Sequence, residues 1–382
     1  MNEHDEVADA ELVEEGRLPA IPEDRTPAVR QADEDPDAWL PPEAQEDVQA
    51  GIAKATRTAY KRDFDEFAAW CTRVGRRPMP AAAQSVTHYI SHLTRAPREK
   101  TGRPYGPATL DRVIAAIRTT HRAADHPVPE TKGAREVVAG YRKRLGTAKD
   151  PAAKPKQATP AKRDVLRAAL AKLDRTTLVG QRDAALMLLG HALAARGSEL
   201  VPLDINSPIP GPDGKGLSFW VYRIKRKMWQ KVAVPYDDDP EVCAATAVEA
   251  LIVSMADEGV TEGPLFVHID RWGYLNPQQC REGKPIGDPL GRISVEAASD
   301  IVDRSMARTG RPGQWSSHSL RRGFVNTSRE AGADILDIGR HGGWSDGSKV
   351  LLGYVEEADG WSDRNPLAQI NKAASKAQEA SE

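Results

Sequence analysis

The sequence predicts a mostly helical protein of two domains, the second of which is of the α+β class and carries a small β-hairpin. Apolar residues recur at spacings of three and four along most of the stretch from residue 51 to residue 355, as they do in amphipathic helices. Only residues 219–224 and 231–234 read as β-strands, and the basic turn 225–230 joins them. Residues 147–159 are rich in Pro, Lys and Ala and lack an apolar period, so we expect a linker there.

Residues 51–146 are predicted to form a bundle of four or five short helices. Thr56 or Thr58 can cap the first helix, and Pro107 and Thr131 open the third and fourth. The apolar stripes are Tyr60, Phe64, Phe67 and Cys71; Val86, Tyr89, Ile90 and Leu93; Leu110, Val113, Ile114 and Ile117; and Val137, Val138, Tyr141 and Leu145. His121 continues the third stripe, so we expect a buried, hydrogen-bonded histidine and not a ligand.

Residues 160–355 are predicted to form the second domain. Thr159 and Pro160 suit the cap and first turn of a helix, and the strongly apolar stretch Gln181–Ala195 predicts a buried helix. The next expected elements are a helix carrying Val165, Leu166, Leu170 and Leu173, a helix opened by Pro240, an irregular stretch at 260–292 and a helix at 293–306. After them we expect helices that hold His318, Trp344 and Tyr354, separated by glycine turns at Gly332 and Gly342-Gly343.

The two ends of the chain differ from its body. Residues 1–50 hold 16 of the 55 acidic residues and 3 of the 53 basic ones, so this segment has a net charge of −13 and the rest has +11. Its composition predicts a disordered acidic tail, which is either a solvated leader or an intramolecular polyanion for the basic body. In the C-terminal tail, 356–382, Leu367, Ile370 and Ala374 predict one amphipathic helix that either frays or docks on a neighbouring protomer.

What the chain lacks argues against several classes of protein. It has no GxxxxGK[ST] loop, no GxGxxG turn after a strand and no HExxH pair, so an ATPase, a dehydrogenase and a metallohydrolase are disfavoured. Three cysteines far apart in sequence fit reduced thiols in the cytoplasm. A mean hydropathy of −0.53 and an acidic N-terminus predict no membrane span and no targeting leader. We expect no metal and no cofactor.

The residues suited to chemistry lie in the second domain. His318 and Arg321 are three residues apart on one helix face, Trp344 and Tyr354 follow, and Arg196 comes after the apolar helix. The planar fork of arginine binds two phosphate oxygens and stays protonated. Ring N–H groups can donate to the same oxygens, and a tyrosine beside cations is a candidate nucleophile. This set predicts cleavage of a phosphodiester without metal.

The order and spacing of these residues resembles the tyrosine recombinase (phage integrase) family, in its simple form without an arm-binding domain. Ala55–Tyr60 and Ala115–His121 are similar to the helical, SAM-like core-binding domain of that family. The resemblance implies a site-specific DNA recombinase that forms a 3′-phosphotyrosyl intermediate and exchanges strands through a Holliday junction. It implies the catalytic set Arg196, Lys225, His318, Arg321, Trp344 and Tyr354, with Tyr354 as the nucleophile.

Two assignments stay open at the level of the sequence. The resemblance implies a lysine of the hairpin as the proton donor to the leaving oxygen; Lys225 is preferred and Lys227 is the rival. The spacing from Trp344 to Tyr354 is one residue longer than is usual in the family, so His341 is an alternative third donor. Glu199 matches the acidic position after the first arginine and is expected to support the site.

The resemblance also implies partners. These are double-stranded DNA with inverted-repeat core sites, further copies of the chain (a dimer on each site and a tetramer in the synapse) and an accessory directionality factor. The resemblance further implies a cytoplasmic, nucleoid-associated protein encoded by a prokaryote, a phage or a mobile element. The basic residues expected to contact DNA are Arg57, Lys61, Arg62, Arg112, Arg118, Lys132, Arg135, Arg142 and Lys143.

Other functions stay open on the same residues. A type IB topoisomerase or a telomere resolvase would use nearly identical chemistry and differ only in its products. A DNA-binding regulator of the same fold, or a basic scaffold for RNA, would form no covalent adduct.

Overall fold

The structure, a computed structural model, is divided into two units, residues 1–156 and 157–382. The predicted acidic tail, 1–50, lies almost wholly outside the residues that the structure describes. These are 53–99, 101–154, 156–275 and 279–379, with Pro41, Glu43, Ala44, Asp47 and Gly51. No helix of this described part is long and apolar enough to cross a membrane.

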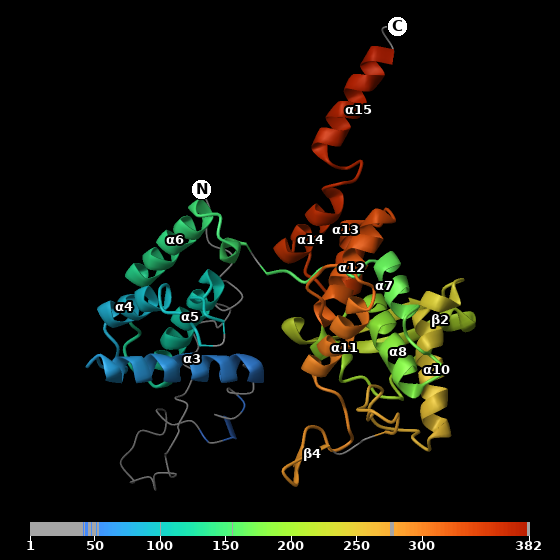
Figure 1. Ribbon diagram of the computed structural model, residues 1–382, viewed down its shortest axis with the longest axis horizontal. Coiled ribbons are helices and arrows are strands. Elements are labelled where there is room, and N and C mark those ends of the chain that lie inside the picture. Colours follow the sequence, from blue (N-terminus) through green and yellow to red (C-terminus); the bar gives the residue numbers. More distant parts are fainter. Residues whose placement is uncertain are drawn as a thin grey trace. The chain divides into compact units, whose positions relative to one another are not determined.

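The described core of the first unit is made of helices (Figure 1). Helix α5 packs against α3, and α6 packs against both α4 and α5. Most residues of the four predicted apolar stripes face this core, among them Phe67, Ile90 and Leu110. The helices are α3 (Lys54–Arg73), α4 (Ala83–Leu93), α5 (Pro107–Ala123) and α6 (Lys132–Thr147), followed by a 3-10 turn at Pro151–Ala153.

His121 is a core residue of the first unit, as the apolar stripe predicts. Its side chain is fully buried, and its Nε2 accepts a hydrogen bond from the backbone N–H of Ala81 at 2.9 Å. Its Nδ1 lies 2.7 Å from the carbonyl of Ile117, and burial lowers the pKa of the imidazole. Both ring nitrogens are therefore used inside the fold, which leaves none for a ligand.

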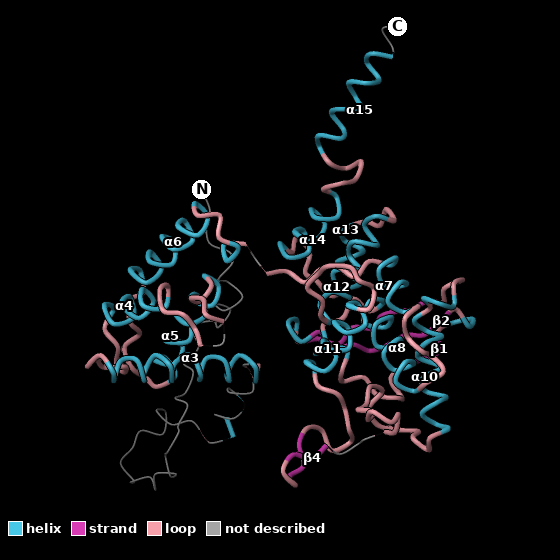
Figure 2. Tube along the Cα trace, in the orientation of Figure 1, coloured by secondary structure: helices cyan, strands magenta, loops and turns pink. Residues whose placement is uncertain are grey.

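The second unit combines helices with two small antiparallel sheets (Figure 2). Helix α8, buried on nearly every side, lies between α10 and α12, and α12 packs against α14. The helices are α7 (Arg163–Leu170), α8 (Leu178–Ala192), α9 (Gly197–Leu200), α10 (Ala244–Asp257), α11 (Val295–Ala307), α12 (Ser317–Glu330), α13 (Ile335–Gly342), α14 (Lys349–Asp359) and α15 (Pro366–Glu379). The strands, in the orders β1-β2-β3 and β4-β5, are β1 (Ile209–Pro210), β2 (Gly216–Arg223), β3 (Met228–Pro235), β4 (Gln279–Arg281) and β5 (Lys284–Ile286).

The main hairpin is longer, and its turn tighter, than the sequence predicts. Strands β2 and β3 pair as far as Arg223 opposite Met228, so the six-residue basic turn was wrong. The turn takes only Ile224–Lys227 because Lys227 adopts the left-handed conformation (φ 50°), which lets the chain reverse within four residues. Lys225 consequently lies inside the turn and not at the end of a strand.

Other boundaries also shift. Helix α8 begins at Leu178, three residues early, because Thr177 Oγ accepts a hydrogen bond from the N–H of Gly180. The stretch 260–292, expected to be irregular, contains the β4–β5 hairpin. Helix α14 continues past residue 355 to Asp359. The C-terminal tail does contain a helix, α15, on which Leu367 and Ile370 are exposed.

Candidate active site

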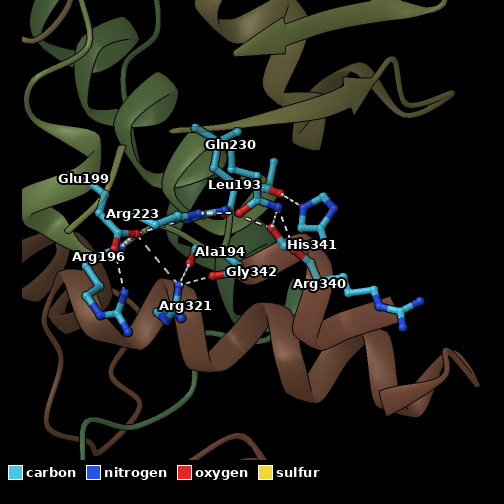
Figure 3. Close-up of polar contacts among 11 residues, drawn as sticks. Leu193, Ala194, Arg196, Glu199, Arg223, Gln230, Arg321, Arg340, His341 and Gly342 are labelled. Carbon is cyan, nitrogen blue, oxygen red and sulfur yellow. Dashed lines mark hydrogen bonds and ion pairs between the residues drawn. The ribbon is translucent and has the colours of Figure 1, made fainter. Parts of the chain in front are cut away.

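The backbone carbonyls at the C-terminal end of α8 bind several side chains of the site. The last carbonyls of a helix lack partners within the helix and carry the negative end of its dipole, so they attract cations. Here three successive carbonyls each accept a hydrogen bond from a different element: Ala192 from His341 Nε2 at 2.7 Å, Leu193 from Arg223 at 3.1 Å, and Ala194 from Arg321. Figure 3 shows this convergence of side chains.

Glu199 is the centre of an arginine cluster. Its carboxylate is fully buried and accepts hydrogen bonds from Arg196 Nη1 at 2.6 Å and from Arg223 Nη1 at 3.0 Å, while Arg321 Nη1 lies 3.9 Å away. Burial alone would raise the pKa of Glu199, but Arg196 and Arg321 outweigh it, so the pKa lies below the usual range. One negative charge thus faces three positive ones, and the cluster keeps an excess positive charge suited to an anion.

Arg223 is the member of this cluster that the sequence-based prediction missed. It ends β2, where Phe219 and Val221 occupy the preceding inward positions, so the alternation of the strand directs Arg223 into the core. Its side chain is 1% exposed. An arginine in a row of core residues was the available signal, because a buried guanidinium needs partners.

Gly343 makes room for Arg223. It has a φ of +71°, in the left-handed region, and a Cβ at this position would lie 2.7 Å from Arg223 Nε. At the preceding Gly342, a Cβ would overlap the ring of Trp344. The glycine pair of the predicted turn therefore allows the backbone of 342–343 to approach both Arg223 and Trp344.

Arg321 and Trp344 form a stacked pair. The guanidinium carbon of Arg321 lies 3.5 Å from the centre of the Trp344 ring, and its Nη1 donates to the carbonyls of Ala194 and Gly342. Arg321 Nη2 is buried without a hydrogen-bond partner among the described residues. Burial, with Arg196 as the next cause, lowers the pKa of Arg321 to about 9, so the group stays charged at neutral pH.

His318 and Tyr354 are in contact. Nε2 of His318 lies 2.7 Å from the hydroxyl of Tyr354, within hydrogen-bond distance. Burial first, and then the charges of Arg321 and Arg196, lower the pKa of His318 to about 4, so the imidazole is neutral at pH 7. The ring of Trp344 meets that of Tyr354 edge to face, with centres 6.3 Å apart.

Arginines beside Tyr354 favour its phenolate, yet in the protein without DNA its pKa is raised and not lowered. Burial raises this pKa, and the opposing effects of Arg322, Arg321 and Arg196 are smaller. The hydroxyl therefore carries its proton at neutral pH, and it needs a base in contact with it, as His318 is.

Arg322 is a second residue that the sequence-based prediction missed. It lies beneath the ring of Tyr354, with its guanidinium carbon 5.1 Å from the ring centre. It also binds Glu357 and the carbonyl of Ala158, and its Nη2 donates to Gln157 Oε1 at 3.0 Å. Gln157 and Ala158, within the expected linker 147–159, are thus bound to the second unit.

The imidazole of His341 is bound by Phe324 and by the backbone of Ala192. Its ring stacks on Phe324, with centres 4.6 Å apart, while its Nε2 bonds to Ala192. Its contribution to the cluster is its backbone carbonyl, which accepts a hydrogen bond from Arg223 at 2.9 Å. Of the two alternatives for the third donor, the structure places Trp344 beside Arg321 and Tyr354.

The turn of the hairpin lies over the Gly342–Trp344 segment. Arg226 Nη1 donates to the carbonyl of Trp344 at 3.2 Å. Lys225 and Lys227 are both exposed in this turn. The charge of Lys225 contributes to the lowered pKa of His318, which places Lys225 within electrostatic range of the site.

The basic residues expected to contact DNA differ in their surroundings. Arg112 donates two hydrogen bonds to the buried carboxylate of Asp63, at 2.7 and 3.0 Å, and is therefore part of the fold of the first unit. Arg142 forms an exposed ion pair with Asp111. Arg118, Lys132 and Arg135 line one open cavity of about 760 Å³ beside Glu130 and Glu136. Arg57 is half-buried, whereas Lys61, Arg62 and Lys143 are exposed.

Known proteins similar to this chain are recombinases, although no family model matches it. An integrase/recombinase of Selenomonas ruminantium, described as a XerD homolog, is 25% identical over 336 residues, which cover 86% of this chain and 89% of that protein. Recombinase Cre of Escherichia phage P1 is 23% identical over 305 residues, 77% of this chain and 81% of Cre. A solved lambda integrase dimer bound to a COC′ core site aligns with a TM-score of 0.48 and 13% identity, over 82% of this chain and 93% of that one.

Proposed function

The chain belongs to the tyrosine recombinase family, and we propose that its site performs the family reaction with Tyr354 as the nucleophile. The protein is a site-specific recombinase that cuts DNA, holds the 3′ end as a phosphotyrosine and rejoins it to a new partner through a Holliday junction. The observation that carries the catalytic assignment is the 2.7 Å contact of Tyr354 with a neutral His318 beside the arginine cluster. A hydroxyl in contact with a base and next to buried cations is suited to attack a phosphodiester.

Arg196, Arg321 and Trp344 hold the phosphate in this proposal. Arg321 Nη2 can donate to a non-bridging oxygen without giving up another hydrogen bond, because it has no partner among the described residues. Glu199 orients Arg196, and Trp344 orients Arg321 by stacking on it. Phosphoryl transfer depends mostly on alignment and on stabilising charge, which fixed arginines supply.

His318 takes the proton of Tyr354 as its oxygen attacks the phosphorus atom. The low pKa of His318 makes it a weak base in the protein alone, and part of that lowering comes from Arg321 and Arg196. A bound phosphate opposes the effect of these charges, so we expect DNA binding to raise the pKa of His318. The base is thereby strengthened when its substrate is present.

Lys225 donates the proton to the leaving 5′ oxygen. The P–O5′ bond breaks, its electron pair stays on the oxygen, and Lys225 Nζ supplies the proton. Support for Lys225 is that its charge is among the causes that lower the pKa of His318, which places it within electrostatic range of the site. The phosphotyrosine preserves the energy of the broken bond, so the reverse attack by a 5′ hydroxyl rejoins the strand without ATP.

The first unit acts as the core-binding domain in this proposal, and residues 160–355 act as the catalytic domain. Exposed cations on α3 and α6 suit the phosphate backbone of DNA. We assign a dimer to each inverted-repeat site and a tetramer to the synapse, with α15 as the element that docks on a neighbouring protomer. Exposed Leu367 and Ile370 on α15 support this docking, because a buried partner face would remove them from water.

The experiment that tests the function is capture of covalent adducts in cells that carry the DNA flanking the gene. Wild-type and Tyr354→Phe proteins are expressed, and denaturant-stable adducts are collected and sequenced. We expect adducts from the wild type alone, mapped to one short inverted repeat. Two plasmids bearing that repeat should then exchange strands. Adducts on all sequences, with relaxation of any supercoiled plasmid, would instead indicate a topoisomerase, and hairpin ends would indicate a telomere resolvase.

A further inference from the structure

Arg223 connects four separate elements through one guanidinium. Its Nη1 donates to Glu199 Oε2 on α9 at 3.0 Å, and its Nη2 donates to Leu193 at the end of α8 at 3.1 Å. The same Nη2 donates to the carbonyl of His341 on α13 at 2.9 Å, and Nε donates to Gln230 Oε1 on β3 at 2.9 Å. Figure 3 shows Arg223 at the crossing of these contacts.

A role in stability alone explains this arrangement poorly. Burying a guanidinium removes its hydration, and well-packed apolar residues usually stabilise a core as well or better than a buried ion pair. A valine or leucine would continue the row of Phe219 and Val221, yet an arginine stands there. The contacts instead fix geometry, because a planar fork with five donors sets the directions of several acceptors at once.

These contacts fix the hairpin from both of its strands. Arg223 is the last residue of β2, two positions before Lys225, and it shares the Glu199 carboxylate with Arg196. Gln230 on β3 accepts from Arg223 and donates through Nε2 to the carbonyls of Arg340 and His341, at 2.6 and 3.2 Å. A movement of the turn that carries Lys225 would therefore break hydrogen bonds to the arginine cluster around Glu199.

We propose that Arg223 is a positioning residue that places Lys225 for proton donation by tying the β2–β3 hairpin to the arginine cluster. Arg223 itself touches neither DNA nor the reacting atoms. The proposal rests on the proposed function, since it takes Tyr354 as the nucleophile and Lys225 as the proton donor. When Arg223 is lost, Tyr354 still attacks the held phosphate, but the P–O5′ bond breaks slowly because the 5′ oxygen leaves without a well-placed proton.

A substrate with sulfur in place of the bridging 5′ oxygen tests this directly. Cleavage breaks the P–S bond and releases a thiolate, which needs no proton because a thiol is far more acidic than an alcohol. A defect confined to proton donation therefore disappears on the sulfur substrate. A variant with a defect in the arginine cluster or in the fold should cleave both substrates slowly.

We expect Arg223→Met to slow single-turnover cleavage of the oxygen substrate by about a hundredfold or more, in the range of general acid catalysis. On the sulfur substrate, its rate should return to within about tenfold of the wild type. Lys225→Ala should behave in the same way, and Arg223→Lys should be intermediate on the oxygen substrate. Arg321→Lys should be slow on both.

The outcomes separate this inference from the proposed function. If sulfur rescues Lys225→Ala but leaves Arg223→Met equally slow on both substrates, the positioning role is overturned and the role of Lys225 stands. If Lys225→Ala is not rescued, Lys225 is not the proton donor, and the role of Arg223 toward it falls as well. A covalent adduct at Tyr354 on the oxygen substrate would in either case still support the proposed function.

Gln230→Ala is a milder variant in case Arg223→Met fails to fold. It removes one partner of Arg223 at the half-buried edge of the hairpin and leaves the guanidinium bound to Glu199, Leu193 and His341. We expect a loss of about tenfold on the oxygen substrate, restored by sulfur, with the unfolding midpoint nearly unchanged. A loss of the same size on both substrates would contradict the proposal.

Discussion

The two units hold their positive charges in opposite ways. In the second unit, Arg223 and Arg321 are buried, and backbone carbonyls, the carboxylate of Glu199 and the ring of Trp344 hold their guanidinium groups in place. In the first unit, Lys132 and Arg135 are exposed on α6, and in the proposed function their long side chains can each reach one of several phosphates. The difference teaches that chemistry on one phosphate needs arginines in fixed positions, whereas attachment to a duplex needs only charge near its surface.

The largest effect should come from Arg321→Lys in the buried cluster. A lysine cannot stack on Trp344 or present a planar fork, so we expect cleavage at saturating protein to slow by about a thousandfold, or about 4 kcal/mol. The matched change Arg142→Lys, in an exposed ion pair of the first unit, should alter the rate by less than about twofold. Equal small effects in a single-turnover assay would remove the distinction between the two units.

Gly343→Ala should have the next largest effect, on folding. An alanine there would take a left-handed φ and place its Cβ against Arg223, so we expect the free energy of unfolding to fall by about 3 kcal/mol. Gly347→Ala is the control, because Gly347 has a φ of +77° with nothing within 4 Å of the added Cβ. It should lose only about 1 kcal/mol in urea titrations. Equal losses would show that Arg223 moves aside freely.

Arg112→Ala tests a cation of the first unit that behaves like those of the second. It leaves the carboxylate of Asp63 buried without its two hydrogen bonds, so we expect a loss of about 2 kcal/mol in the free energy of unfolding. The salt dependence of DNA binding should stay the same. An unchanged stability with a shallower salt dependence would make Arg112 a DNA contact after all.

Lys132→Ala combined with Arg135→Ala should weaken DNA binding without slowing the chemistry. Loss of two phosphate contacts lowers the slope of log affinity against log salt by about 1.8. The rate of adduct formation at saturating protein should match the wild type. A binding titration at several salt concentrations checks the first result. A normal slope would place the DNA contacts of the first unit on other residues.

The smallest effect concerns the pH dependence of stability. The pKa of His318 is lowered from about 6.5 to about 4, so the folded protein binds fewer protons than the unfolded chain between these values. Its contribution to stability is complete above pH 6.5 and is lost as the pH falls toward 4. Between pH 7 and pH 4.5 the free energy of unfolding should therefore decrease, and we expect His318→Asn to make this decrease smaller by on the order of 1 kcal/mol. Identical pH profiles would contradict the lowered pKa.

The sequence predicted the helices well because the apolar spacing that marks each buried helix face is a local pattern. The stripes ending at Cys71, Leu93 and Leu145 all face the core of the first unit. The residues of the proposed site, from Arg196 to Tyr354, could be selected from the sequence because each lies in a distinct local motif. The structure brings His318 and Tyr354 together by packing α12 against α14, and Trp344, which lies between α13 and α14, stacks on Arg321.

What the sequence could not supply were the contacts between distant elements. The sharing of Glu199 by Arg196 and Arg223 depends on how β2 lies against α9, which no local spacing reveals. The tight turn at Lys227 depends on a left-handed residue that is not a glycine. The raised pKa of Tyr354 depends on burial, which outweighs charges that the sequence makes visible.

The most direct test of the central claim is to identify the residue that carries DNA in the covalent adduct. Trypsin would release residues 350–364, after Lys349 and Arg364, as a peptide whose one tyrosine is Tyr354. After nuclease treatment, mass spectrometry should find the remaining nucleotide on this peptide, and Tyr354→Phe should give no adduct. A nucleotide on any other peptide, or equal adducts from both proteins, would contradict the account.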